Sequence, residues 1–234
     1  MKIAALGDLH YTSRSAGLLK HLLNGMEGRA DVLVLAGDLT NMGRMVEIEL
    51  LIKDLRQITI PIIAVVGNHD HESDQQQELV QLMEKANVCV LDCTSCVIEG
   101  IGFVGSKGFC GGFGERMVSV FGERAIKSFV QESISETERL ARALASMTVK
   151  RRVAVLHYGP VKGTLAGEPE EIIPFLGTSR LAEVLDQYGV DMIFHGHAHH
   201  GRYESKTPGG IPVYNVARFV LAREGEKPFR IFEM

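Results

Sequence analysis

Five apolar runs in this chain each end directly in side chains that commonly bind metal ions. The clearest run is 62–66, an Ile-Ile-Ala-Val-Val stretch typical of a buried strand in a largely parallel sheet. Gly67 breaks this run, and Asn68, His69 and Asp70 follow at once. Because α/β sheets bind ligands at the carboxyl ends of their strands, this placement predicts a site. The residues of the same kind that follow the other four runs are Asp8 and His10, Asp38, His157, and His197 and His199.

The order of the predicted elements is that of an α/β (α+β) protein with mixed sheets. Strands at 2–7, 31–36 and 62–66 alternate with amphipathic helices at 15–27 and 44–57, which favours parallel strands joined by right-handed crossovers. After a helix at 75–86, short strands separated by turn residues suggest hairpins. These short strands are expected at 88–91, 95–99 and 101–105, and later strands at 152–156, 190–195, 202–204, 211–216, 218–222 and 228–232. Ser179 is expected to cap a helix that stops at Gly189.

The length of 234 residues predicts a single domain over 1–234. One segment, at about 106–148, is unlike the rest. A loop rich in glycine and aromatic residues, which includes the glycines at 111–114, precedes a long helical stretch at 122–147. We interpret the segment as an insertion that forms a cap or rim over the site, with the loop as a lid. The loop is no P-loop, because no Gly-Lys-Ser/Thr follows it.

The composition excludes several classes of protein. With 45% hydrophobic and 23% charged residues, the chain is neither disordered nor fibrous. A net charge of -4 gives no support to a nucleic-acid partner. No stretch approaches the ~18 apolar residues that a membrane span needs. Removal of a signal peptide would take Asp8 with it, so we expect a cytoplasmic protein.

The four cysteines gather in a short part of the chain, at Cys89, Cys93, Cys96 and Cys110. The spacing of Cys93 and Cys96 is that of one half of a zinc ribbon, but no second pair follows. We interpret the cysteines as buried or incidental thiols, and a redox or metal role is the alternative.

The candidate metal ligands number seven, which is too many for one tetrahedral ion. They are Asp8, His10, Asp38, Asn68, His157, His197 and His199. Two ions are the natural solution, with Asp38 bridging them through its two carboxylate oxygens. Paired ions roughly 3.5–4 Å apart can hold a phosphate and lower the pKa of a shared water, so that a bridging hydroxide attacks phosphorus in line with the leaving oxygen. Imidazole and carboxylate ligands without thiolate suit transition metals better than calcium. We expect manganese or iron, with zinc, cobalt and nickel as alternatives.

The complete set of motifs resembles the signature of the calcineurin-like metallophosphoesterases. Its parts are Asp8-x-His10, Gly37-Asp38, Gly67-Asn68-His69-Asp70, His157 and Gly196-His197-x-His199, in the order of that family. The resemblance implies a four-layer sandwich of two mixed sheets flanked by helices. It also implies that Asp8, His10, Asp38 and His199 hold one ion, and that Asp38, Asn68, His157 and His197 hold the other.

By the same resemblance, His69 is no metal ligand but contacts the phosphate and protonates the leaving group. Many family members place an acidic residue three positions after the bridging aspartate, where it pairs with the catalytic histidine. Here that position is Asn41, which can accept a hydrogen bond from an imidazole but supplies no charge. Asp70 is the alternative partner of His69, although adjacent side chains rarely pair in this way.

The expected reaction is metal-dependent hydrolysis of a small-molecule or nucleotide phosphate ester. The resemblance favours phosphodiesters, because a histidine at position 10 goes with diesterase activity in the family. Phosphomonoesterase and nuclease activity on the same site are the alternatives within enzymes. A non-catalytic docking module with the same fold is a further alternative, although such modules usually lose ligands or the catalytic histidine, and here all are present.

Several other side chains are candidates for substrate contact. His71, Tyr158 and His200 flank the motifs, and each either touches substrate or lies on the rim. His195 is expected to be a core residue. The cations that could bind phosphate oxygens, with a plain surface position as the alternative for each, are Lys107, Arg116, Arg124 and Arg218.

Overall fold

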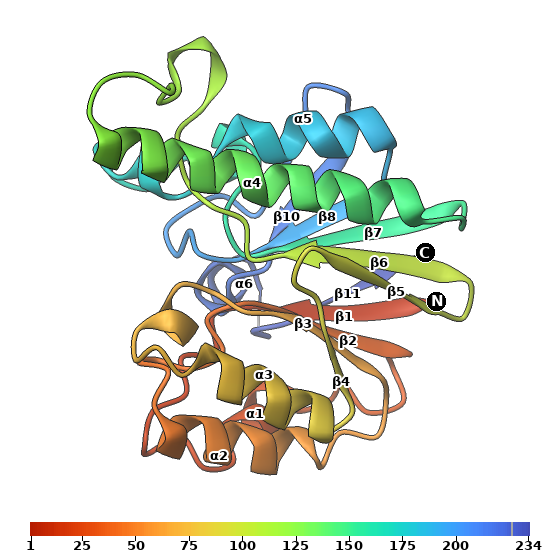
Figure 1. Ribbon diagram of the computed structural model, residues 1–234. Coiled ribbons are helices and arrows are strands. Elements are labelled where there is room, and N and C mark those ends of the chain that lie inside the picture. The colour runs from red at the N-terminus through yellow and green to blue at the C-terminus, as the bar shows by residue number, and fades with distance from the viewer. Residues whose placement is uncertain (226) are drawn as a thin grey trace.

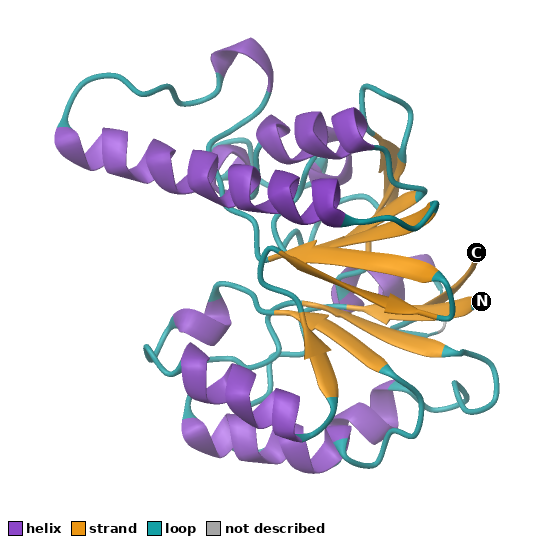
Figure 2. Ribbon diagram, turned by 45° about the vertical axis from the view of Figure 1, so that its right-hand side comes forward, coloured by secondary structure: helices purple, strands orange, loops and turns teal. Residues whose placement is uncertain are grey.

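The computed structural model describes residues 1–225 and 227–234. Two β-sheets stack face to face between two layers of helices (Figure 1). Figure 2 shows the same four layers from a second direction, with helices on the outer side of each sheet. Each sheet combines parallel and antiparallel strand pairs, so the expected sandwich of two mixed sheets is confirmed.

The first sheet contains β1 to β4 side by side and parallel, with β11 antiparallel along β1. In spatial order its strands are β11 (Arg230–Glu233), β1 (Lys2–Leu6), β2 (Val32–Ala36), β3 (Ile62–Val65) and β4 (Val88–Val90). All five residues of β2 are buried, as expected for an apolar strand that is covered on both faces.

The second sheet has four parallel strands in its middle and an antiparallel strand at each edge. In spatial order its strands are β5 (Thr94–Ile98), β6 (Ile101–Ser106), β7 (Arg151–Leu156), β8 (Met192–His195), β10 (Pro212–Asn215) and β9 (Glu204–Lys206). The β5–β6 hairpin turns at Glu99 and Gly100, which have φ of 48° and 80°. Positive φ at both central residues is the mark of the hairpin turn that matches the natural twist of the strands.

The alternation of side chains along β7 shows how the sheets are packed. Val153 and Val155 belong to the core that contains the first sheet, whereas Ala154 and Leu156 belong to the core beneath α4 and α5. Both faces of the strand are therefore buried, which explains why its sequence is continuously apolar.

The helices form the two outer layers. The first sheet is covered by α1 (Leu18–Leu22), α2 (Met45–Leu55) and α3 (Gln76–Lys85), and the second by α4 (Arg124–Ser146) and α5 (Ser179–Tyr188). The last helix, α6 (Arg218–Glu224), follows β10 beside the end of β1, where Gly7 pairs with Ala217. Among the described residues, no helix has both the length and the apolar character needed to cross a membrane.

Three sequence predictions about elements were wrong. Residues 218–222 were expected as a strand but lie in α6, since a short apolar run cannot distinguish strand from helix, and leucine, alanine and arginine favour helix. The helix expected at 15–27 is reduced to α1, because Gly17 and Gly25 adopt φ of 79° and 80°. The N-cap of α5 is Thr178, whose side chain accepts from the Arg180 N–H, and Ser179 is already helical.

The segment 106–148 divides into a projecting loop and a layer helix. Val130, Leu140 and Leu144 of α4 are buried, and the helix packs along α5. The chain between β6 and α4 extends beyond the helical layer at the upper left of Figure 1. Phe121 in this loop is 80% exposed.

Candidate metal centre

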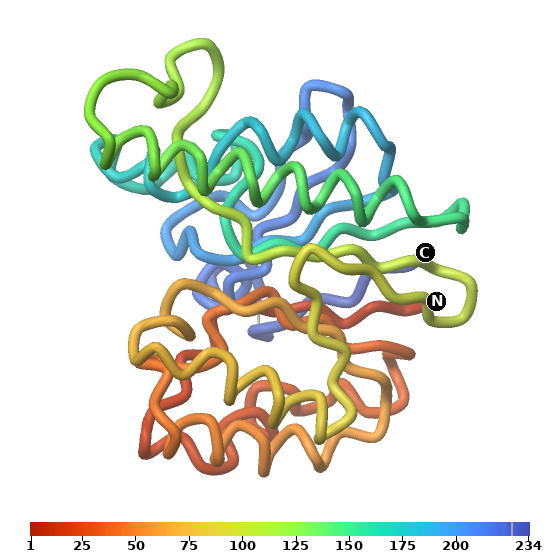
Figure 3. The backbone as a smooth tube through the Cα atoms, viewed as in Figure 1, coloured from red at the N-terminus to blue at the C-terminus, as the bar shows by residue number. Residues whose placement is uncertain are grey.

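The loops that follow five strands meet at one end of the sandwich. In Figure 3, the loops after β1, β2 and β3 approach those after β7 and β8 at the end away from the chain termini. Two groups of metal-type side chains form there. The first contains Asp8, His10, Asp38 and His199, and the second contains Asp38, His157 and His197.

In the first group, one ligand-type atom from each residue lies within 4.8 Å of every other. His199 Nε2 lies 2.9 Å from Asp8 Oδ1 and 3.4 Å from His10 Nε2. His10 Nε2 lies 3.8 Å from Asp38 Oδ2. The backbone N–H of His197 donates to Asp8 Oδ1 at 3.0 Å, which ties the β8 loop to the β1 loop.

In the second group, His157 contacts two other predicted ligands. Its Nε2 lies 3.2 Å from Asp38 Oδ1 and 2.9 Å from Asn68 Oδ1. Its Nδ1 lies 3.0 Å from the carbonyl oxygen of Ala36, which fixes the ring and leaves Nε2 for the centre. The ring centroid of His197 lies 4.8 Å from that of His157.

Asp38 belongs to both groups through different oxygens. Its Oδ2 faces His10 and its Oδ1 faces His157. The side chain is 1% exposed, so both oxygens are enclosed by the site.

Four of the predicted ligands adopt the left-handed backbone conformation. The φ values are 59° for Asp8, 48° for His10, 48° for Asp38 and 71° for His197. Residues other than glycine rarely adopt such φ values, and they persist only where the surroundings hold them. Four of the eight non-glycine residues with positive φ in the described chain are therefore predicted ligands.

The electrostatics of the second group reflect its burial. Burial alone would lower the pKa of His157, but the Asp38 carboxylate outweighs it and raises that pKa to about 9. Burial opposes ionisation of Asp38, yet His157 holds the pKa of this carboxyl well below its usual range. A cation bound between them would replace the proton on His157, because metals bind neutral imidazole.

Two further histidines stay neutral. Burial lowers the pKa of His10 to about 4 and that of His197 to about 3. Within the described chain, His197 Nε2 is buried without a hydrogen-bond partner. Neutral, unpartnered imidazole nitrogen beside buried carboxylates is the donor set that transition metals take, so the residues fit metal ions.

His69 lies outside both groups but faces them. Its Nε2 is 3.9 Å from Asp38 Oδ2, and its ring meets that of His10 edge-on with centroids 4.7 Å apart. Its Nδ1 lies 2.7 Å from the backbone carbonyl oxygen of Asn41. Asn41 therefore orients His69 through its backbone, and the amide side chain considered from the sequence plays no part in this contact.

The carboxylate of Asp70 binds backbone groups of two neighbouring loops. Its carboxylate is fully buried and accepts from the backbone N–H groups of Leu39, Thr40 and Gly67 at 3.1, 2.8 and 2.8 Å. It also accepts from the Thr40 hydroxyl at 2.6 Å. These bonds join the loop that carries Asp38 to the loop that carries Asn68, so the described contacts give Asp70 a positioning role in place of a pairing with His69.

Two aromatic side chains border the candidate metal centre, Tyr158 beside the second ligand group and Phe219 beside the first. The ring centroid of Tyr158 lies 4.5 Å from that of His197, and that of Phe219 lies 4.5 Å from that of His199. Arg218 lies over the Phe219 ring at 4.6 Å. Sequence reasoning missed Phe219, since its segment was expected to be a strand.

Five other sequence candidates belong to neither ligand group. His71 Nε2 is buried and has no hydrogen-bond partner within the described chain. His195 is buried, with its ring nitrogens 2.8 Å from Gly196 O and from Thr164 Oγ1, as expected for a core residue. His200 is exposed, and its backbone N–H donates to the carboxylate of Glu168. Arg116 and Arg124 are exposed on the projecting loop and at the start of α4.

The cysteines are all free, and Cys110 is buried. Cys93 forms a third cluster of metal-type side chains with Asp92 and Glu136. Arg139 lies 2.8 Å from the Asp92 carboxylate and 3.4 Å from that of Glu136. A guanidinium thus pairs with both acidic groups of this cluster and offsets part of their negative charge.

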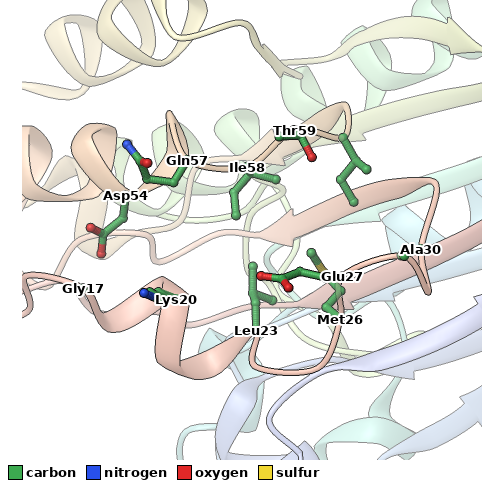
Figure 4. Close-up of a pocket in the computed structure, with 12 residues that line it drawn as sticks. Gly17, Lys20, Leu23, Met26, Glu27, Ala30, Asp54, Gln57, Ile58 and Thr59 are labelled. Carbon is green, nitrogen blue, oxygen red and sulfur yellow. The ribbon is translucent and has the colours of Figure 1, made fainter.

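A cavity of about 420 Å³ lies between the α1 region and the end of α2 (Figure 4). Lys20, Glu27 and Asp54 supply its charged lining, and Leu23 and Ile58 its apolar lining. None of the residues of the two ligand groups borders it. The candidate metal centre is therefore a separate site.

The comparison with protein families agrees with the geometry. The sequence model of the family described as Calcineurin-like phosphoesterase matches residues 1–201. The glycerophosphodiester phosphodiesterase GpdQ of Enterobacter lignolyticus is 28% identical over 85 residues. That match covers 31% of this chain and 31% of the relative, so the chain spans less than a third of the length of the curated protein it matches.

Solved structures show the same fold. Phosphopantetheinyl hydrolase (PptH) of Mycobacterium tuberculosis has a TM-score of 0.70 at 17% identity, over 99% of this chain and 95% of that one. TT1561 of Thermus thermophilus has a TM-score of 0.63 at 13% identity, over 99% and 98%. At these identities, the likeness concerns the architecture alone.

Proposed function

The chain belongs to the calcineurin-like phosphoesterase family and is a metal-dependent phosphoester hydrolase, and from this we propose that it cleaves phosphodiesters with two ions. The observation that carries the proposal is the position of Asp38, whose two oxygens face different ligand groups. Asp8, His10, Asp38 and His199 would hold one ion, and Asp38, Asn68, His157 and His197 the other.

When bound, such ions polarise a phosphate and lower the pKa of a water molecule that attacks it. The donors are imidazole, carboxylate and amide, with no thiolate among them. This set favours manganese or iron, with zinc, cobalt and nickel as alternatives.

His69 is the proposed acid. Its Nδ1 is held by the carbonyl of Asn41, so Nε2 is the nitrogen that points toward the ligand groups and toward the leaving oxygen of a bound ester. A side chain held in this way loses little freedom when substrate binds. A positioned general acid contributes roughly 10²–10⁴ in rate.

Two observations support a diester substrate. His10 is present and lies in the first group, and a histidine at this position goes with diesterase activity in the family. The curated relative GpdQ is a glycerophosphodiester phosphodiesterase. We therefore infer that the substrate is a small-molecule or nucleotide phosphodiester.

The test combines metal analysis with two chromogenic substrates. Metal-stripped protein is reloaded with manganese, iron, zinc, cobalt or nickel, and ion content is measured beside hydrolysis of bis-p-nitrophenyl phosphate and p-nitrophenyl phosphate. Asp38→Asn should lose both bound metal and activity. Asp191→Asn is the matched control. Asp191 precedes β8, at the end of the strand away from the ligand groups, and its carboxylate accepts a hydrogen bond from the backbone N–H of Arg152.

The outcomes separate the parts of the proposal. Two ions per chain and a faster diester rate support it. One ion per chain in an active enzyme overturns the binuclear centre. A monoester rate far above the diester rate makes the protein a phosphomonoesterase.

A further inference from the structure

The loop after β6 places a lysine beside the second ligand group. The backbone carbonyl of Lys107 accepts the N–H groups of His157 and Tyr158 at 3.1 and 3.0 Å, so this loop is fixed to the end of β7. Lys107 Nζ lies 5.2 Å from the ring centroid of Tyr158, whose centroid lies 4.5 Å from that of His197. The ring of Tyr158 is therefore close both to the ammonium group and to His197, a predicted metal ligand.

A buried carboxylate of α4 holds the same loop from the other side. Glu136 is 5% exposed, and its Oε1 accepts from the Ser106 hydroxyl at 2.6 Å and from the Gly108 N–H at 3.1 Å. Both neighbours of Lys107 are thus fixed in place. Preorganisation of this kind reduces the ordering cost when a ligand binds.

Lys107 forms no ion pair with a carboxylate in the described part of the chain. Its ammonium donates to the Gly108 carbonyl oxygen at 2.9 Å and lies 5.0 Å from the Phe109 ring centroid. Lys107 is half-buried. A cation that is partly removed from water and has no carboxylate as ion-pair partner favours an anionic ligand.

We propose that Lys107 is the cation of an anion subsite, bordered by Tyr158, that binds a second negatively charged group of the substrate. The inference rests on the proposed function, in which the scissile phosphate lies at the metal centre. The substrate class is then narrower: phosphodiesters in which one ester arm carries a carboxylate or a further phosphate.

The test uses pairs of p-nitrophenyl phosphodiesters. In each pair, the second arm is a linear hydroxy acid or its neutral amide, and a series of arm lengths covers the distance from the metal centre to Lys107. At the best length, the wild type should show a KM for the acid that is lower than for the amide by about 10-fold, as for a charge-assisted hydrogen bond. Added salt should reduce this preference.

The variants assign the preference to one residue. Lys107→Gln should bring the ratio of the two KM values close to one, and Lys107→Arg should retain part of it. Lys53→Gln, an exposed lysine of α2, is the matched control and should keep the full ratio. If Lys107→Gln fails to fold, the KM ratio of the wild type, its dependence on salt and the ratio in Lys107→Arg still test the subsite.

The failure of this subsite differs from the failure of the proposed function. A metal-loaded wild type that turns over the diesters without preferring the acid at any arm length overturns the subsite alone, as does a preference that survives in Lys107→Gln. A metal-loaded wild type that hydrolyses none of the diesters overturns the proposed function and the subsite together.

Discussion

Replacing Gly67 by alanine should disable the metal centre while leaving most of the fold intact. A Cβ atom at this position would collide with the Asp38 carboxylate and backbone nitrogen, and would lie 2.8 Å from His157 Nε2. Real Cβ atoms essentially never approach another heavy atom within 3.0 Å. Because one colliding atom belongs to the backbone and the others to enclosed ligands, the loops after β2 and β3 have to separate.

The size of the effect follows from this contact. Relief requires a shift of about 1 Å between Asp38 and the Gly67 loop, and a misplacement of that size lowers the rate by about 10²-fold. Overpacking of this kind costs about 1–3 kcal/mol of unfolding free energy, which lowers the Tm of a chain of this length by about 2–12 °C. The loss of rate should thus exceed what unfolding at the assay temperature explains.

The assay measures bound metal, kcat/KM for bis-p-nitrophenyl phosphate, and Tm of Gly67→Ala. The matched control is Gly100→Ala, which has φ of 80° and no atom within 4 Å of its Cβ. It should lose about 1 kcal/mol from backbone strain and keep both metal and activity. Wild-type metal content and kcat/KM in Gly67→Ala would refute the reasoning, because the two loops would then not be fixed by this contact.

Three further predictions concern a catalytic side chain, a core histidine and the metal itself. His69→Ala should lower kcat by about 10²–10⁴ while metal content stays constant, whereas a docking module would be indifferent to this change in a partner-binding assay. Burial lowers the pKa of His195 to about 4, so its neutral form stabilises the fold above pH 6.5 and this stability is lost as pH falls toward 4. Urea unfolding of metal-free protein at pH 7 and pH 4 should then show a loss about 3 kcal/mol larger in the wild type than in His195→Gln, and equal losses would contradict it. Chelation should lower Tm, since an ion present at about 100 times its Kd contributes about 2.7 kcal/mol, and an unchanged Tm after complete removal would show that the ions do not stabilise the fold.

The convergence of the predicted ligands could be expected from the sequence, because it depends on where the strands end. Each of the five apolar runs predicts a buried strand, and the residues after it then lie at the carboxyl edge of the sheet. His157 and Asp38 are far apart in the sequence, yet both follow such runs and lie 3.2 Å apart. Parallel strands in stacked sheets bring these ends together whatever the connections contain.

The orientation of His69 could not be predicted in the same way. Sequence motifs are defined by side chains, so the candidates for the partner of the His69 imidazole were the side chains of Asn41 and Asp70. The structure uses a backbone carbonyl, which every residue possesses, so the identity of residue 41 carries no signal for this contact. Phe219 was missed for a different reason, since tertiary packing decides between helix and strand for so short a run.

The backbone conformation and the burial of the predicted ligands both cost free energy. Left-handed φ values at non-glycine residues cost about 1–3 kcal/mol each, and four of the predicted ligands adopt them. Burial also opposes charge on both Asp38 and His157, which stay ionised only because they face each other. Cations bound between these residues would supply the missing attraction and leave imidazole neutral. We interpret this strain as preorganisation: the fold holds the predicted ligands in place, so that ion binding would not consume free energy in assembling them.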